Sequence, residues 1–523
     1  MLLSLSKLYR GAISSAAGTA FSRVLGAARD VILARVLGAG AISDAFWVAF
    51  TVPTVFRRFV ADEGLTGVMV PALTDAEDKE GKEEAQRLSG ALFLALVLVC
   101  TVLCIAGAWF APWLVRAFAF GFTNDPEQFS LTVQLTRWMF PFVLFVSLVS
   151  WCEGLLNMRD HYFIPKAAPG LVSAGIIVAA LFASGLNIST TASLVGGLLI
   201  GGLVHFLVCL PAVLKIWGPL RINIQSWSTP RFARIRNEMG KVIAIGVFAQ
   251  LNIMMLRLLA SLLPTGSVTQ YWYANRVVDL AQGVIAVAVG SAMLPPISKA
   301  VAAGDWTRFE ETFVDAARMA AIVLIPAAGL LLAIPDAIVR TLFQHGQFSS
   351  AAAELTVDCL IGMVPFMLAV AGINLIKKPF FALDRRDLLL LVGAIGLLFT
   401  FISGWGLAIH LNLGVRGLAF ALSLSTTVQF IAYVWLLQQK VGASIGVRRL
   451  VTPFARMTLG AVPASLSAWS ICNLGQFEHG PSLLNIGILI LSCAVAAVVY
   501  IACAWALNIR TEINAVLRKI RRR

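Results

Sequence analysis

The sequence has little charge and lacks the local motifs by which many enzymes are recognised. Charged residues make up 13% of the 523 and hydrophobic residues 59%, whereas soluble domains contain roughly 25% and 45–50%. No P-loop, G-x-S-x-G or paired-carboxylate motif occurs, and no polar stretch is long enough to form a catalytic domain. We therefore expect neither an enzyme nor an ATPase in this chain.

Cysteine and histidine are also sparse and unpatterned. The eight cysteines fall almost entirely in apolar runs, without C-x-x-C or Cys/His spacing, and the five histidines are scattered. Such cysteines are typical small buried side chains. The sequence therefore predicts no metal site and no cofactor.

Long apolar runs dominate what is present. The mean hydropathy is +0.84, and many runs reach the 20 or so residues with which a helix crosses a bilayer. Clear examples are residues 90–111, 132–156, 170–186, 320–334, 388–409 and 482–507. The first run is too long for a cleavable signal peptide and is not followed by an A-x-A site. We predict an all-α polytopic membrane protein with about fourteen transmembrane helices.

The basic residues are distributed unevenly between alternate connections. With a cytoplasmic N-terminus, most Lys and Arg residues fall in cytoplasmic connections, and the opposite set holds little beyond Arg116, Arg340 and Arg416. The positive-inside rule then places both termini in the cytoplasm. The net charge of +14 follows from this bias, so we expect no nucleic-acid partner.

An internal repeat divides the chain near its midpoint. DAFWVAF begins at Asp44 and QYWYANR begins at Gln270, 226 positions later, and each follows a glycine-containing turn. Both copies start from the same side, so the halves are predicted to be parallel repeats. The expected organisation is an N-lobe of six helices (1–218), a cytoplasmic linker (219–240), a C-lobe of six helices (241–440) and two additional helices with a basic cytoplasmic tail (441–523).

Charged side chains occur where lipid should exclude them. A charge at mid-membrane costs at least about 2.5–3.5 kcal/mol, so it needs a partner or a wet cavity. The residues concerned are Arg23, Arg29, Asp30, Arg35, Arg57, Arg58, Glu153, Arg257 and Arg276. Mutual neutralisation is one explanation: Arg29 with Asp30, Arg35 with Asp44, and Glu153 with an arginine. It does not account for all of them, because the arginines outnumber the acids.

The surplus of arginine predicts an anion-accepting cavity. Arg23, Arg29 and Arg35 are six residues apart, about 240° on a regular helix, so they share a cavity only if the helix bends, for which Gly26 is a candidate. Pro53 weakens the next helix shortly before Arg57 and Arg58. The guanidinium fork binds two phosphate oxygens at once and stays charged when desolvated. We therefore expect a phosphate-bearing cargo.

Several motifs together give a family resemblance. FSRVLGAARD, GAGAISDAFWVAF, the Arg57–Arg58 pair, Val70–Pro71, YWYANR, LPPISK and TLFQHGQF occur in this order. The chain resembles the MurJ (MviN) lipid II flippases, of the superfamily of multidrug and polysaccharide exporters, from about residue 10 to past residue 440. The last two helices match by position more than by motif.

The resemblance implies a V-shaped cavity between two lobes and a function in cell wall synthesis. The expected activity is flipping of lipid II, the undecaprenyl-diphosphate-linked peptidoglycan precursor, across the bacterial inner membrane, with lipid II, membrane lipids and the cell-wall synthesis machinery as candidate partners. The family's cavity arginines correspond to Arg23, Arg29, Arg58 and Arg276. The expected gate or charge network consists of Asp30, Arg35, Asp44 and Arg57.

This chain departs from the family pattern near the last of these arginines. Where the family often has Ala-Asp-Arg, this chain has Ala274-Asn275-Arg276, so the local pairing of Arg276 must differ. Glu153 and Arg257 match no family motif. Two alternative functions remain: export of another undecaprenyl-linked oligosaccharide, and cation-coupled drug antiport, which predicts acids rather than arginines in the first lobe. A membrane scaffold would need neither the repeat nor the surplus charge.

Overall fold

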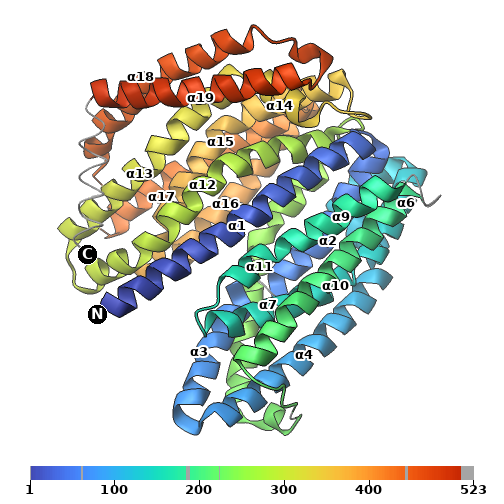
Figure 1. The fold of residues 1–523 in the computed structure, drawn as a ribbon, viewed down its shortest axis with the longest axis vertical. Helices are drawn as coiled ribbons and strands as arrows, with labels where there is room; N and C mark the ends of the chain where they lie inside the picture. The colour runs from blue at the N-terminus through green and yellow to red at the C-terminus, as the bar shows by residue number, and fades with distance from the viewer. Residues whose placement is uncertain are drawn as a thin grey trace. The chain divides into compact units, whose positions relative to one another are not determined.

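A computed structural model describes residues 2–60, 63–183, 189–222, 224–383, 385–441 and 446–507. These residues form helices joined by short connections, and none of them lies in a β-strand. The chain divides into two compact units, residues 1–268 and residues 269–523 (Figure 1). The prediction of an all-α fold is confirmed.

The first unit contains thirteen helical elements within its described residues. They are α1 (Leu2–Leu37), α2 (Ala41–Val60), α3 (Glu63–Glu80), α4 (Lys82–Trp109), α5 (Ala111–Phe118), η1 (Phe120–Asn124), α6 (Pro126–Met139), α7 (Phe142–Asn157), α8 (Phe163–Ala167), α9 (Pro169–Phe182), α10 (Thr190–Ile216), η3 (Ile224–Ser228) and α11 (Pro230–Ser261).

The second unit holds the remaining elements. They are α12 (Ser267–Ala302), which begins just before the boundary, α13 (Trp306–Ala333), α14 (Pro335–Phe343), α15 (Ser350–Ala382), α16 (Arg386–Gly404), η4 (Trp405–His410), α17 (Gly414–Val441), α18 (Val447–Cys472), η5 (Phe477–His479) and α19 (Leu483–Ala506).

Polar residues at the helix ends explain where several of these helices begin. Side-chain oxygens cap the first turns of α6, α10, α11, α13, α15 and α19 by accepting hydrogen bonds from backbone N–H groups; the capping residues are Asp125, Ser189, Thr229, Asp305, Ser349 and Ser482. A proline at the first helical position follows the cap of α6 and of α11. This combination satisfies N–H groups that have no partner within the helix.

Nine helical segments of the described residues are long and apolar enough to cross a membrane. They are Lys82–Trp109, Pro126–Asn157, Phe163–Phe182, Thr190–Ile216, Trp306–Ala333, Ser350–Phe381, Asp387–His410, Gly414–Gln439 and Leu483–Ala506. The polytopic character of the chain is thus confirmed. The count of fourteen helices and the cytoplasmic position of both termini stay predictions. The predicted basic tail, from residue 508 onward, lies outside the described residues.

Small residues bring helices of the first unit into close contact. A Cβ atom at Gly175 of α9 would lie 2.4 Å from the carbonyl oxygen of Gly197 on α10. Similarly, a Cβ at Gly18 of α1 would lie 2.9 Å from the carbonyl oxygen of Phe163, at the start of α8. Such backbone approach is typical of helix packing in membranes. It fixes α1 alongside α8 and α9, and Figure 1 shows α1 beside α9.

The connection between α10 and α11 is fastened to α4. The Gln86 side chain donates to the carbonyl oxygen of Trp217 over 2.9 Å, and the Trp227 indole donates to that of Ala91 over 3.1 Å. Arg221 forms an ion pair with Glu83 at 2.9 Å. We call residues 217–232 the strap. The described residues of the strap thus contact α4, within the same unit; the assignment of residues 219–240 as a cytoplasmic linker stays a prediction.

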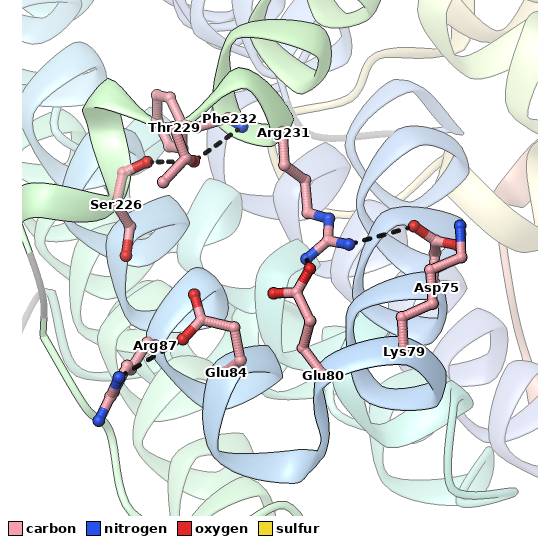
Figure 2. Close-up of polar contacts among 9 residues, drawn as sticks. All are labelled: Asp75, Lys79, Glu80, Glu84, Arg87, Ser226, Thr229, Arg231 and Phe232. Carbon is pink, nitrogen blue, oxygen red and sulfur yellow. Dashed lines mark hydrogen bonds and ion pairs between the residues drawn. The ribbon is translucent and has the colours of Figure 1, made fainter.

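Charged contacts continue from the strap into α11, as Figure 2 shows. Arg231, at the start of α11, contacts Asp75 at 3.4 Å and Glu80 at 2.9 Å, both on α3. Lys79 also pairs with Asp75, and its hydrogen bond, helped by the charge of Arg231, holds the pKa of Asp75 below its usual range. The N-terminal end of α11 is therefore held by ion pairs against the helical hairpin of α3 and α4.

The other end of α11 is also held within the first unit. The backbone N–H of Gly121, in η1, donates to the Ser261 hydroxyl over 3.1 Å. A Cβ at Gly121 would lie 2.0 Å from the Ser261 carbonyl oxygen, so only glycine permits this approach. Both ends of α11 are thus held by other elements of the first unit, and the boundary between the two compact units falls after α11. The predicted lobes, which concern how the chain moves, stay a prediction.

In the second unit the additional helices α18 and α19 lie side by side, and α18 packs against α13 (Figure 1). The start of α12 packs on the end of α14 and the segment after it: the ring of Tyr273 is 4.6 Å from that of Phe343 and 5.5 Å from that of Phe348. Trp47 in α2, which is 226 positions before Tyr273, is likewise fully buried. The two equivalent positions of the predicted repeat are therefore both buried.

Candidate substrate-binding site

The first pair of predicted cavity arginines lies on α1 in two different environments. Arg23 is exposed and forms no ion pair with a described residue. Arg29 is only 6% exposed, and its neighbour Asp30 is 3% exposed. The two arginines therefore differ in how freely they can meet a ligand.

Arg29 is held by a carboxylate and an aromatic ring. Its Nε and Nη2 atoms donate to the same oxygen of Asp30, over 3.0 and 2.7 Å. Its guanidinium carbon lies 5.8 Å from the centre of the Phe50 ring on α2. A buried pair with two charge-assisted hydrogen bonds is strong. The neutralisation of Arg29 by Asp30 expected from the sequence is present.

Asp44 accepts a hydrogen bond from a backbone group, whereas the sequence suggested an ion pair with Arg35. Its carboxylate is 2% exposed and accepts a hydrogen bond from the backbone N–H of Gly266 over 2.7 Å. Gly266 has φ +97°, a conformation that favours glycine. Arg35, at the end of α1, is exposed and forms no ion pair with a described residue. In this conformation Asp44 therefore holds the turn before α12 and does not pair with Arg35.

The arginine pair of α2 follows Pro53, around which the helix continues to Val60. Arg58 is exposed, and its Nη1 donates to the side-chain oxygen of Gln250, on α11, over 3.2 Å. Arg57 is partly buried and lies close enough to His205 on α10 to act on it electrostatically. The two neighbouring arginines thus face different surroundings within the first unit.

Arg276 lies on α12 in the second unit. Its guanidinium carbon is 5.1 Å from the centre of the Trp272 ring, one turn earlier. Its Nη1 is 3.6 Å from a carboxylate oxygen of Asp279, one turn later. The side chains of Arg276 and Asp279 are 33% and 46% exposed. This arginine therefore also has an aromatic ring and a carboxylate beside it, but in a looser arrangement than that of Arg29.

The structure also supplies partners that the sequence did not identify. Glu153 on α7 pairs with Lys166 on α8 rather than with an arginine. Arg257, which is buried on α11, donates to the carbonyl oxygen of Val268 over 3.4 Å. Lys166 and Gln250 are polar residues within apolar stretches, and this was the signal that could have pointed to them.

The second unit contains an apolar pocket of about 570 Å³ between α13, α18 and α19. Its lining includes Pro326, Leu330, Ala464, Ala497 and Tyr500. Such a lining offers contacts to hydrocarbon and no charged group for a phosphate. Within the described residues, no group of three or more His, Cys, Asp or Glu side chains is placed to hold a metal ion.

A family model described as "Lipid II flippase MurJ" matches residues 33–485. The chain belongs to the MurJ family. The match begins in α1 and ends in α19, so it includes Arg35, Arg58 and Arg276, while Arg23 and Arg29 precede it.

Curated relatives and a solved structure agree with this assignment. The lipid II flippase MurJ of Burkholderia cenocepacia is 30% identical over 374 residues, covering 71% of this chain and 72% of that protein. The probable lipid II flippase MurJ of Bdellovibrio bacteriovorus is 26% identical and covers 96% of this chain and 95% of its own length. A structure titled "Lipid II flippase MurJ, inward closed conformation" has a TM-score of 0.75 at 21% identity, over 94% of this chain and 98% of that one; at this identity it supports the fold alone.

Proposed function

We propose that this bacterial inner-membrane protein flips lipid II from the cytoplasmic to the periplasmic leaflet by alternating access, and so supplies the precursor for cell wall synthesis. The observation that carries the proposal is the family match over residues 33–485, in a helical fold with membrane-spanning helices. The match does not favour export of another oligosaccharide or of drugs.

The arginines give this proposal a chemical basis. Arg23, Arg58 and Arg276 have side chains that are exposed or partly exposed, and each would contribute charge-assisted hydrogen bonds to the diphosphate of the cargo. Arg29 is committed to Asp30, so it would shape the site and add positive potential more than it would bind phosphate directly. Asp30, Arg35, Asp44 and Arg57 form the proposed charge network around them.

The proposed process is transport without covalent chemistry or a bound cofactor. The contacts of the arginines with the diphosphate need only replace the hydration that the diphosphate loses on entering the site. The conformational change then moves the cargo between leaflets. We propose that residues 1–218 and 241–440 act as the two lobes in this cycle, joined by residues 219–240, with residues 441–523 as an addition. Lipid II is the proposed cargo, and the cell-wall synthesis machinery is a candidate partner.

The test is a depletion experiment in cells that carry the protein as their only flippase. After depletion, lipid II should accumulate in the cytoplasmic leaflet, and expression of the wild-type chain should reverse this. Arg23→Ala, Arg58→Ala and Arg276→Ala should each fail to reverse it while still reaching the membrane. The matched control is Arg137→Ala, because Arg137 is exposed at the end of α6, where it donates to the Ala108 carbonyl. An unchanged leaflet distribution after depletion would refute the proposal.

A further inference from the structure

Two side chains of the same helix lie beside the guanidinium of Arg276. Trp272 lies one turn before it and Asp279 one turn after it, at 5.1 Å and 3.6 Å. Residues three and four positions apart share one face of an α-helix, so these contacts follow from the sequence spacing. Cation–π contact with the tryptophan restrains the position of the guanidinium group.

Asn275 completes the arrangement. Its side-chain Nδ2 donates to Oδ2 of Asp279 over 3.1 Å, and Oδ2 is also the oxygen nearest to Arg276. The amide therefore orients the carboxylate toward the arginine. Asn275 occupies the position at which the MurJ resemblance leads one to expect an aspartate, so in this chain the negative charge beside Arg276 stands one turn later.

The contact between Arg276 and Asp279 is weak by comparison with that of Arg29. The pair Arg29–Asp30 has a distance of 2.7 Å and side chains that are 8% and 4% exposed. The pair Arg276–Asp279 is longer than a charge-assisted hydrogen bond, for which about 2.7–2.9 Å is typical, and both side chains are accessible. Exposed pairs of this kind contribute little. A diphosphate, with several anionic oxygens, can replace such a partner.

From this geometry we propose that Asp279 is an exchangeable counter-ion of Arg276, kept in place by Asn275, that the anionic headgroup of the cargo displaces. The inference rests on the proposed function. When the cavity is empty, Asp279 lowers the net positive charge at Arg276 and holds the side chain in place. When the diphosphate binds, it replaces the Asp279 carboxylate as the partner of the Arg276 guanidinium. When the cargo is released, the carboxylate pairs with the guanidinium again. Asp279 is thus a positioning residue that limits affinity and speeds release.

The test measures binding of purified lipid II to the full chain in lipid nanodiscs, together with turnover in vesicles. Asp279→Asn removes a competitor for Arg276, so lipid II should bind about two- to fivefold more tightly, in line with the modest strength of accessible ion pairs, while turnover at saturating lipid II should fall. In the Arg276→Ala background the same change should have no effect on affinity. The control is Asp336→Asn, which removes the carboxylate of another ion pair within one helix, the i, i+4 pair with Arg340 on α14, and should leave the affinity unchanged.

A second variant keeps the charge and moves it. Asn275→Asp together with Asp279→Asn places the carboxylate directly before Arg276, and affinity should return to within about twofold of the wild type. Weaker binding by Asp279→Asn, or equal tightening with and without Arg276, would overturn the proposal. Failure of the wild-type chain to bind or flip lipid II would instead overturn the proposed function, so the two failures are distinguishable.

Discussion

The carboxylate of Asp44 accepts a hydrogen bond from the backbone N–H of Gly266, 2.7 Å away and 222 positions later in the chain. This contact joins the start of α2 to the turn between α11 and α12. Because the carboxylate is buried, it has no access to bulk water as an alternative donor. The turn and the helix should therefore separate only together with a change in the hydrogen bonding of Asp44.

Replacing Asp44 tests this contact. Asp44→Ala should lower the free energy of unfolding by about 1–3 kcal/mol, since it leaves the Gly266 N–H buried without an acceptor. Asp44→Asn keeps an oxygen acceptor and should cost less. Thermal unfolding of the purified protein measures both. Equal losses for the two variants would show that the charge matters and that the hydrogen bond does not.

The same residue provides a test of the predicted gate. A pair between Arg35 and Asp44 requires Asp44 to leave Gly266, so it can form only in another conformation. Cysteines placed near Arg35 and Asp44, with both charged residues kept, should crosslink weakly in the conformation seen here and more strongly when lipid II supply changes the population of states. Crosslinking that does not depend on substrate supply would contradict a gating role.

Arg23 and Arg29 should give different results when each is replaced. Arg29→Ala removes two charge-assisted hydrogen bonds from the buried Asp30 and should destabilise the protein by about 1.5–3 kcal/mol. Arg23→Ala should leave the free energy of unfolding nearly unchanged, because Arg23 is exposed and forms no ion pair with a described residue. It should nevertheless abolish flipping, because Arg23 is one of the proposed contacts to the diphosphate. Lysine should rescue Arg29 poorly, since it lacks the fork that bonds Asp30 through two nitrogens. Thermal unfolding and leaflet-resolved lipid II assays separate the two effects. If alanine at Arg23, Arg29, Arg58 and Arg276 left flipping normal, the cationic cavity would be refuted.

The strap offers a prediction that depends on one glycine. A Cβ at Gly90 would lie 2.3 Å from the Arg221 carbonyl oxygen, so Gly90→Ala must displace the strap from α4 and should cost about 1–3 kcal/mol of stability. Gly196→Ala is the matched control, because nothing lies within 4 Å of its Cβ position in α10, and it should be neutral or stabilising by up to about 1 kcal/mol. Similar effects of the two changes on thermal unfolding would contradict a tightly held strap.

The sequence was sufficient to predict the helical class and several local features. Runs of about 20 apolar residues identify membrane helices because lipid leaves the backbone no other partner. The pairing of Arg29 with its neighbour Asp30 was equally accessible, since it needs no tertiary information. The buried positions of Trp47 and Tyr273 agree with the repeat, which was also read from the sequence.

Contacts between distant segments could not be predicted in the same way. Glu153 was expected to meet an arginine, but α8 brings Lys166 to it, and the sequence contains no signal for how a five-residue helix is placed. The bond from Gly266 to Asp44 uses a backbone group, which has no residue signature. Residues 219–240 were predicted to be a linker because they form a long polar connection near the midpoint of the chain, and this stays a prediction. The contacts of the strap with α4 use main-chain oxygens of Trp217 and Ala91, so the sequence contains no signal for them.

His205 gives a prediction about stability. It is 3% exposed on α10, and neither of its ring nitrogens has a hydrogen-bond partner in the part of the chain that the structure describes. A buried polar group without a partner is destabilising, so His205→Met should raise the free energy of unfolding by about 1–2 kcal/mol with flipping unchanged. His410→Met is the control, because His410 is exposed, and it should have little effect. A loss of flipping in His205→Met would indicate that the imidazole finds a partner in another state.

The driving force for the cycle can be tested through the membrane potential. The diphosphate makes the cargo negative, and each elementary charge that crosses 100 mV is worth about 2.3 kcal/mol, so an inside-negative potential favours outward movement of the loaded carrier. Asp30 and Asp279 lie beside Arg29 and Arg276, which would reduce the positive charge that the carrier brings back after releasing its cargo. The exposed Arg23 and Arg35 would keep that return step favourable.

We therefore predict that collapsing the potential while keeping the pH gradient stops flipping, and that collapsing the pH gradient alone does not. Leaflet-resolved assays of lipid II in cells treated with the two kinds of ionophore would measure this. Variants that remove one positive charge should differ according to where that charge lies. Arg23→Gln should weaken the dependence of any residual flipping on the potential, whereas Arg137→Gln should not. If loss of the pH gradient alone stopped flipping, proton antiport would be favoured. Glu153 and Asp279 would then be the carboxylates to test, because each lies beside a basic partner that could compete with the proton.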